Sequence, residues 1–178
     1  IATINSDFTT ESLSPRLIDR AAVLTLPTPD LRMLAAAEKP LDWSADRPVV
    51  DWQRFLALFA AAKPASASII EKLEAVCGCY AQGGRPASPR TMRAMLRFAS
   101  TAASLFESKD GMTAEQQALD RAVAQKLLPK INGSGEVYRR SLELLLGCCE
   151  DNGWRMSAER LAAILARGAE NMDDYGFF

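Results

Sequence analysis

Two arginines, Arg16 and Arg20, lie about one helical turn apart in the stretch LSPRLIDRAAV near the start of this 178-residue chain. An arginine side chain keeps its proton, and its planar guanidinium can bind two phosphate oxygens at once. Such a group stabilises the negative charge that develops during phosphoryl transfer, and in some systems a neighbouring subunit supplies it. Both arginines are therefore candidates for a phosphate-binding role.

Asn5 and Arg90 fit the same chemistry. Asn5 follows the β-branched run IATI, which predicts a strand, and a polar side chain at the carboxyl end of a strand can orient a water that attacks a phosphate. Arg90 lies in ASPRTMR, where serine and proline predict the N-cap and first position of a helix. Each has a structural alternative: Asn5 as a loop cap, Arg20 paired with Glu11, and Arg90 as a solvated first-turn residue.

The amino-acid composition excludes several classes of catalytic and binding site. The chain has no histidine, which excludes serine–histidine and cysteine–histidine nucleophile systems within it. Its 21 basic and 22 acidic residues give a net charge of -1, so global charge does not mark a nucleic-acid or membrane binder. No apolar run reaches the ~20 residues that span a bilayer, and we expect a cytoplasmic protein without a membrane partner. The four cysteines lie in apolar helical patterns, and we interpret them as core residues rather than metal ligands.

The hydrophobic pattern predicts three regions. Residues 1–27 read as a strand at Ile1–Ile4, a polar loop, a short helix and a second strand at Val23–Leu26. Residues 28–50 are a proline-rich linker, and residues 51–178 have apolar residues at helical spacing. The expected fold class is mainly α: a bundle of about six helices after a two-strand remnant of an α/β sheet.

The six expected helices are delimited by turn residues and N-caps. They begin near Trp52, Ser66, Ser88, Thr113, Tyr138 and Ser157, and the first five end near Pro64, Gly83, Asp110, Pro129 and Asn152. The sequence NGSG after Pro129 reads as a turn, and the last helix fades into the tail MDDYGFF. We expect Trp52 and Trp154 to pack in the interior rather than to stack on bases.

A resemblance to a known family rests on several of these stretches. IATIN, the polar loop after it and LSPRLIDRA look like the sensor-1 strand and arginine-finger segment of AAA+ ATPases, most nearly the McrB-like branch. LDRAVAQKLLPKINGSG and the ending YGFF are similar to how such domains continue and close. The resemblance covers most of the chain, with gaps in the proline-rich part.

The resemblance implies roles for individual residues. Asn5 matches the sensor-1 residue and Arg20 the arginine finger, with Arg16 as the competing finger candidate. Arg90 matches the sensor-2 arginine, which reaches the nucleotide of its own subunit from the start of a lid helix. The implied parent is a ring-forming NTPase that uses ATP or GTP with Mg²⁺ to remodel or translocate a partner, with DNA or a protein as the substrate.

The sequence also departs from that family. It has no G-x-x-x-x-G-K-[ST] loop and no strand ending in paired acids, so we expect no hydrolysis and no bound nucleotide from this chain alone. The expectation is a C-terminal part of a larger motor. The alternative is a non-enzymatic helical module that binds protein or nucleic acid. A helical transcription regulator is a weaker reading, because no helix-turn-helix with a basic recognition helix stands out.

Overall fold

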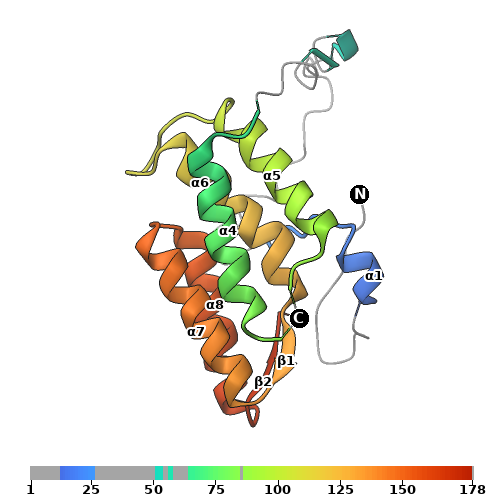
Figure 1. Cartoon of the computed structure of the whole chain (residues 1–178), viewed down its shortest axis with the longest axis vertical. Coiled ribbons are helices and arrows are strands. Elements are labelled where there is room, and N and C mark those ends of the chain that lie inside the picture. The colour runs from blue at the N-terminus through green and yellow to red at the C-terminus, as the bar shows by residue number, and fades with distance from the viewer. Residues whose placement is uncertain (1–12, 27–50, 54–55, 58–63, 85, 178) are drawn as a thin grey trace, which may run out of the picture. The chain divides into compact units, whose positions relative to one another are not determined.

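A computed structural model describes residues 13–26, 51–53, 56–57, 64–84 and 86–177 (Figure 1). The chain divides into two compact units. One combines Ile1–Val23 with Lys63–Phe178, and the other is Leu24–Ala62. In the second unit, the described residues Trp52, Gln53, Leu56 and Ala57 have helical backbone, as the sequence predicts. The other side chains that define that predicted helix, Phe55 and Phe59, lie outside the described residues.

Three helices of the larger unit begin at local N-caps that the sequence predicts. α4 (Ala67–Ala81), α5 (Pro89–Ala103) and α6 (Ala114–Ala122) start after Ser66, Ser88 and Thr113, whose hydroxyls accept hydrogen bonds from amides in the first turn. Thr113 and Gln116 also form a reciprocal capping box. These local contacts fix where each helix begins.

The predicted ends of α5 and α6 were less accurate. α5 stops at Ala103, before the expected end at Asp110, and Asp110 and Gly111 form a tight turn with φ of 55° and 76°. α6 is followed by a π-helical turn, η1 (Val123–Leu127), and a 3₁₀ turn, η2 (Leu128–Lys130). Pro129 lacks the N–H that a continuing α-helix requires, so the chain leaves helical geometry there.

α7 (Glu136–Asp151) and α8 (Arg155–Glu170) lie side by side and are joined at Asn152–Gly153 (Figure 1). The sequence predicts Ser157 as the residue before the last helix, but α8 begins two residues earlier and its N-cap Trp154 makes no side-chain cap. The Asp120 carboxylate of α6 instead accepts from the amides of Met156 and Ser157 at 2.9 and 2.8 Å. A tertiary contact replaces the expected local cap.

The described residues contain one two-stranded antiparallel sheet, formed by β1 (Asn132–Ser134) and β2 (Asp174–Gly176), with Gly133 opposite Tyr175. β1 leads into α7 and β2 follows α8, so the two-stranded sheet closes one end of this helix pair (Figure 1). The interpretation of NGSG as a turn was wrong, because its first three residues form β1.

The fold class is confirmed as mainly helical with a two-stranded sheet, but the strands are not those expected near the start of the chain. Residues 21–26 form no strand, and the Val23 amide donates to the Gln125 carbonyl of η1 at 3.1 Å. A backbone donor satisfied by the helical body no longer needs a strand partner. The other expected strand, Ile1–Ile4, lies outside the described residues.

The core lies between α4, α5, α6, α7 and α8. The apolar faces predicted for α4 and α7 are confirmed: Ile69, Leu73, Val76, Cys77 and Tyr80 are buried, and so are Tyr138, Leu142, Leu145 and Cys149. Trp154 is fully buried as expected, whereas Met92 and Trp52 are 42% and 62% exposed and do not pack as predicted. Among the described residues, no helix combines the length and apolarity that crossing a bilayer requires.

Candidate functional site

The arginines near the start of the chain lie on and just after a single helical turn. α1 (Pro15–Ile18) begins at Ser14, whose Oγ accepts from the Leu17 amide at 3.3 Å, with Pro15 at its first position as predicted. The helix ends before Asp19, so Arg16 lies on α1 and Arg20 in the turn that follows. The expectation that both arginines share one helix was therefore wrong, although both side chains are exposed.

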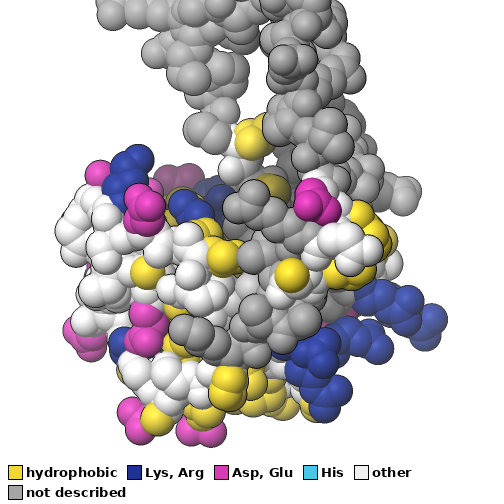
Figure 2. Space-filling view, turned by 90° about the horizontal axis from the view of Figure 1, so that it is seen from above, with side chains coloured by type: hydrophobic (Ala, Val, Ile, Leu, Met, Phe, Trp, Pro, Cys, Tyr) yellow, Lys and Arg dark blue, Asp and Glu magenta, His cyan; other side chains and the backbone are white. Residues whose placement is uncertain are grey.

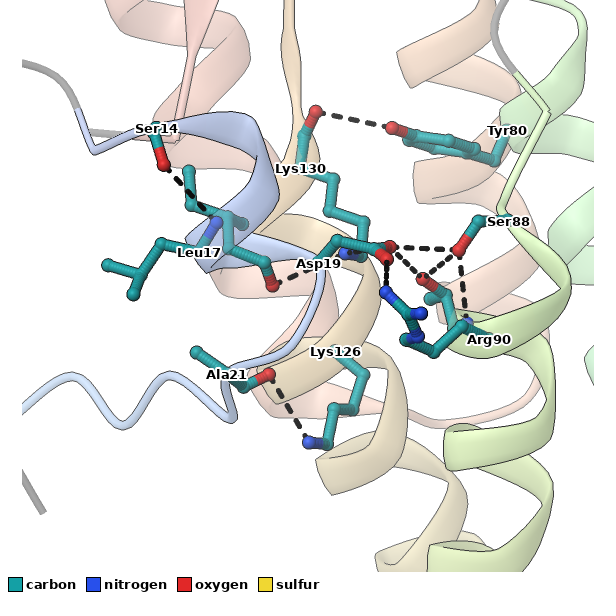
Figure 3. Close-up of polar contacts among 11 residues, drawn as sticks. Ser14, Leu17, Asp19, Ala21, Tyr80, Ser88, Arg90, Lys126 and Lys130 are labelled. Carbon is teal, nitrogen blue, oxygen red and sulfur yellow. Dashed lines mark hydrogen bonds and ion pairs between the residues drawn. The ribbon is translucent and has the colours of Figure 1, made fainter.

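Asp19, between the helix and Arg20, is the centre of a polar cluster (Figure 3). Its Oδ1 accepts from Ser88 Oγ at 2.8 Å and from Thr91 Oγ1 at 3.0 Å, both at the start of α5. Oδ1 also accepts from Lys130 Nζ at 3.0 Å, and Oδ2 accepts from Arg90 at 3.2 Å. One carboxylate thus joins α1, α5 and η2.

Two lysines hold the backbone around Asp19. Lys130 Nζ also donates to the Ile18 carbonyl at 3.3 Å, and Lys126 Nζ donates to the Ala21 carbonyl at 3.2 Å (Figure 3). Carbonyls at the end of a helix have no intrahelical partner, so ammonium groups there satisfy exposed acceptors. Residues 18–23 are consequently docked on the helical body mainly through polar contacts.

The surroundings in this cluster shift the pKa values of Asp19 and Lys126. The hydrogen bond from Lys130 holds the pKa of the Asp19 carboxyl well below its usual range, and the Ser88 and Thr91 hydroxyls lower it further. Partial burial of Asp19 opposes this shift but does not outweigh it. Burial lowers the pKa of the Lys126 ammonium, and the nearby charge of Lys130 adds to that effect.

A pocket of about 660 Å³ opens beside this cluster. Its lining includes Asp19 and four cationic side chains: Arg16, Arg20, Arg90 and Lys130. Arg90 is largely exposed, whereas the Lys130 side chain is only 14% exposed. Among the described lining residues, one carboxylate stands beside four cations, and this balance of charge would attract an anion such as a phosphate group.

The structure thus brings together three of the four residues singled out from the sequence. Arg16, Arg20 and Arg90 line one pocket, and Asn5 lies outside the described residues. Sequence reasoning did not assign Lys130 to the site, and it considered Asp19 only as an ion-pair partner for Arg16 or Arg20. The LIDR stretch, in which Asp19 directly precedes Arg20, was the sequence feature that could have pointed to Asp19. No neighbouring residue indicates that the Asp19 carboxylate contacts Lys130 of η2.

Cysteine and carboxylate side chains give no sign of a metal site. Among the described residues, no group of three or more Cys, Asp or Glu side chains is arranged to hold a metal ion. All four cysteines are free; Cys77 and Cys149 are buried, as expected for core residues, while Cys79 and Cys148 are half-buried.

The chain matches a known protein family over most of its length. A family model described as "Domain of unknown function (DUF8727)" matches residues 47–177. The chain belongs to this family. No curated protein and no solved structure matches the chain. The DUF8727 segment contains Arg90 and Lys130, whereas Arg16, Asp19 and Arg20 precede it, so the pocket is built from both the DUF8727 domain and the segment before it.

Proposed function

We propose that this chain is the C-terminal, lid-bearing part of a ring-forming AAA+ NTPase that uses ATP or GTP to remodel or translocate a DNA or protein partner. The observation that supports the proposal is the pocket lined by Arg16, Arg20, Arg90 and Lys130. Three of these are the arginines to which the AAA+ resemblance gives phosphate-binding roles. They come from two segments far apart in the sequence, yet they face one space.

The cationic side chains that line the pocket suit the binding of a triphosphate. Phosphoryl transfer requires little covalent chemistry from the protein, and most of the catalysis is positioning and stabilisation of charge on the phosphate oxygens. Guanidinium groups bind those oxygens in a bidentate manner, and the Lys130 ammonium adds a compact positive charge. The N-terminus of α5 also lies at this pocket, and its helix dipole favours an anion, while the Ser88 and Thr91 hydroxyls there donate to Asp19.

In this proposal each arginine has a separate task. Arg90, in the first turn of the lid helix α5, binds a phosphate of its own subunit's nucleotide, whereas Arg20 stabilises the transition state on the adjacent subunit. Arg16 remains the alternative for that second role. The loop that cradles the phosphates and the acids that hold Mg²⁺ would lie in another segment of the parent protein. This sequence contains neither a P-loop nor a strand ending in paired acids.

Steady-state hydrolysis by the parent protein tests the proposal. Arg20→Ala is expected to lower kcat by about 10³-fold or more, the scale typical of arginine fingers. Arg90→Ala is expected to weaken nucleotide binding and to raise KM, because it contacts the nucleotide before the reaction. Arg140→Ala is the matched control, since this exposed arginine of α7 pairs with Glu136 and does not line the pocket.

A mixing experiment tests whether Arg20 acts between subunits. Arg20→Ala subunits are combined with subunits whose P-loop lysine has been replaced, so that neither preparation hydrolyses nucleotide alone. A finger supplied by the neighbour restores part of the activity in mixed rings. If Arg20→Ala and Arg16→Ala both leave turnover unchanged in an assembled ring, the finger assignment is wrong.

A further inference from the structure

A row of arginines runs along the outer face of α5, away from the core. Arg90, Arg93 and Arg97 fall within about 60° of one another around the helix axis. The buried residues of the same helix, Thr91, Met95, Ala99 and Ala102, lie on the opposite side. All three arginines are exposed. We call this row the α5 arginine stripe.

The stability of α5 does not account for the stripe. The helix contains no acidic residue, and its first turn carries arginine at the end where the helix dipole disfavours a cation. Arg90 forms an ion pair with Asp19 at 3.2 Å. Within the part of the chain that the structure describes, Arg93 and Arg97 form no ion pair. Figure 2 shows Lys and Arg side chains projecting together from one edge of the molecule.

We propose that the α5 arginine stripe binds the phosphodiester backbone of a nucleic acid. The inference rests on Arg93 and Arg97, which do not line the nucleotide pocket, and it is therefore independent of the function proposed above. All three residues are arginine, whose flat guanidinium matches a phosphate group better than the ammonium of lysine does. The net charge of -1 confines this attraction to a local surface.

The length of the stripe is compatible with several phosphates of a nucleic acid backbone. From Arg90 to Arg97 the helix rises about 10 Å. Phosphates of one strand of a duplex follow one another at about 3.4 Å along its axis, so a surface of this length meets about three of them. Contacts of this kind bind without reading the base sequence.

The binding is measured with the 178-residue chain and a fluorescently labelled mixed-sequence DNA duplex, by anisotropy at several salt concentrations. The two phosphate contacts of Arg93 and Arg97 contribute about -2 to the slope of log K against log salt concentration. The double variant Arg93→Ala/Arg97→Ala is expected to reduce the slope by about two. Arg93→Lys/Arg97→Lys should keep most of the slope. Arg140→Ala/Arg155→Ala, at exposed arginines of α7 and α8, is the control and should leave it unchanged.

Three comparisons complete the test. Binding to a duplex RNA with the same two-residue sensitivity supports the proposal, because the backbone chemistry is shared. Equally tight binding to polyglutamate with that sensitivity overturns it in favour of an acidic protein partner. A salt slope that is the same in Arg93→Ala/Arg97→Ala and in the wild type also overturns it, provided that circular dichroism shows both proteins folded.

Discussion

Lys130 Nζ donates a 3.0 Å hydrogen bond to the Asp19 carboxylate, although 111 positions separate the two residues in the sequence. The same ammonium also donates to the Ile18 carbonyl. Lys130 therefore holds both the side chain and the backbone of the segment that carries Arg20. This contact decides where the candidate arginine finger lies relative to the DUF8727 domain.

Removal of the Asp19 carboxylate is expected to release the α1 segment. In Asp19→Ala the side chains of Lys130, Arg90 and Ser88 lose their common acceptor, and hydrogen bonds to charged groups contribute about 1.5–3 kcal/mol each. We expect protection of the Leu17–Ala21 amides from hydrogen exchange to fall by about tenfold or more, with little change in α7 and α8. Glu71→Gln, at an exposed carboxylate of α4, should change neither. Unaltered exchange in Asp19→Ala would contradict this role.

The docking of the same segment depends on pH in a defined direction. The folded-state pKa of Asp19 is depressed, chiefly by Lys130, so ionised Asp19 stabilises the docked segment fully above the unfolded-state pKa of about 3.9. This contribution is lost as pH falls below that value and through the folded-state pKa. The carboxyl carbon chemical shift of Asp19 should still report the ionised form at about pH 3. In Asp19→Asn the acid-dependent part of segment release should disappear.

Asp120 is expected to be essential for the start of α8. It is 4% exposed, and besides the two α8 amides it accepts from Ser157 Oγ at 2.6 Å. Asp120→Ala leaves these buried donors unsatisfied, which costs about 2–4 kcal/mol of unfolding free energy in urea denaturation. Ser157→Ala removes only the hydroxyl and should cost less. A pair of equally stable variants would show that the contact is not a helix cap.

Two glycines of the α7–α8 pair are expected to respond in opposite ways to alanine. A Cβ at Gly168 would overlap the ring of Tyr175, which is fully buried against α8, so Gly168→Ala should be strongly destabilising and should displace β2. Gly147 lies within α7, and a Cβ added there would have open space around it, so Gly147→Ala should stabilise by about 0.5–1 kcal/mol. Thermal unfolding of both variants measures the contrast.

Cysteine reactivity should follow burial. Burial, together with the neighbouring Cys79, raises the pKa of the Cys148 thiol to about 11, and the pKa of Cys149 is raised further. Because the thiolate is the reactive form, both residues should be alkylated by iodoacetamide much more slowly at about pH 7.5 than a free cysteine. Modification should become rapid in urea. Fast modification of Cys149 in the native protein would contradict its complete burial.

Local chemistry was enough to predict much of the helical body. The hydroxyls of Ser66, Ser88 and Thr113 bond to amides three residues away, and such contacts can be read from neighbouring letters. The buried face of α4 was predicted because its apolar residues recur at the helical period. The arginines that line the cationic pocket were also candidates from their residue type and their resemblance to a known pattern.

Contacts between distant residues decided the remainder. The strand pairing of Gly133 with Tyr175, the cap that Asp120 places on α8 and the bond from Lys130 to Asp19 each join segments that no local pattern relates. The same is true of Val23, whose amide takes a carbonyl of η1 as its partner instead of a strand. A hydrogen bond depends on distance in space and not on separation along the chain, so only the folded arrangement could reveal these partners.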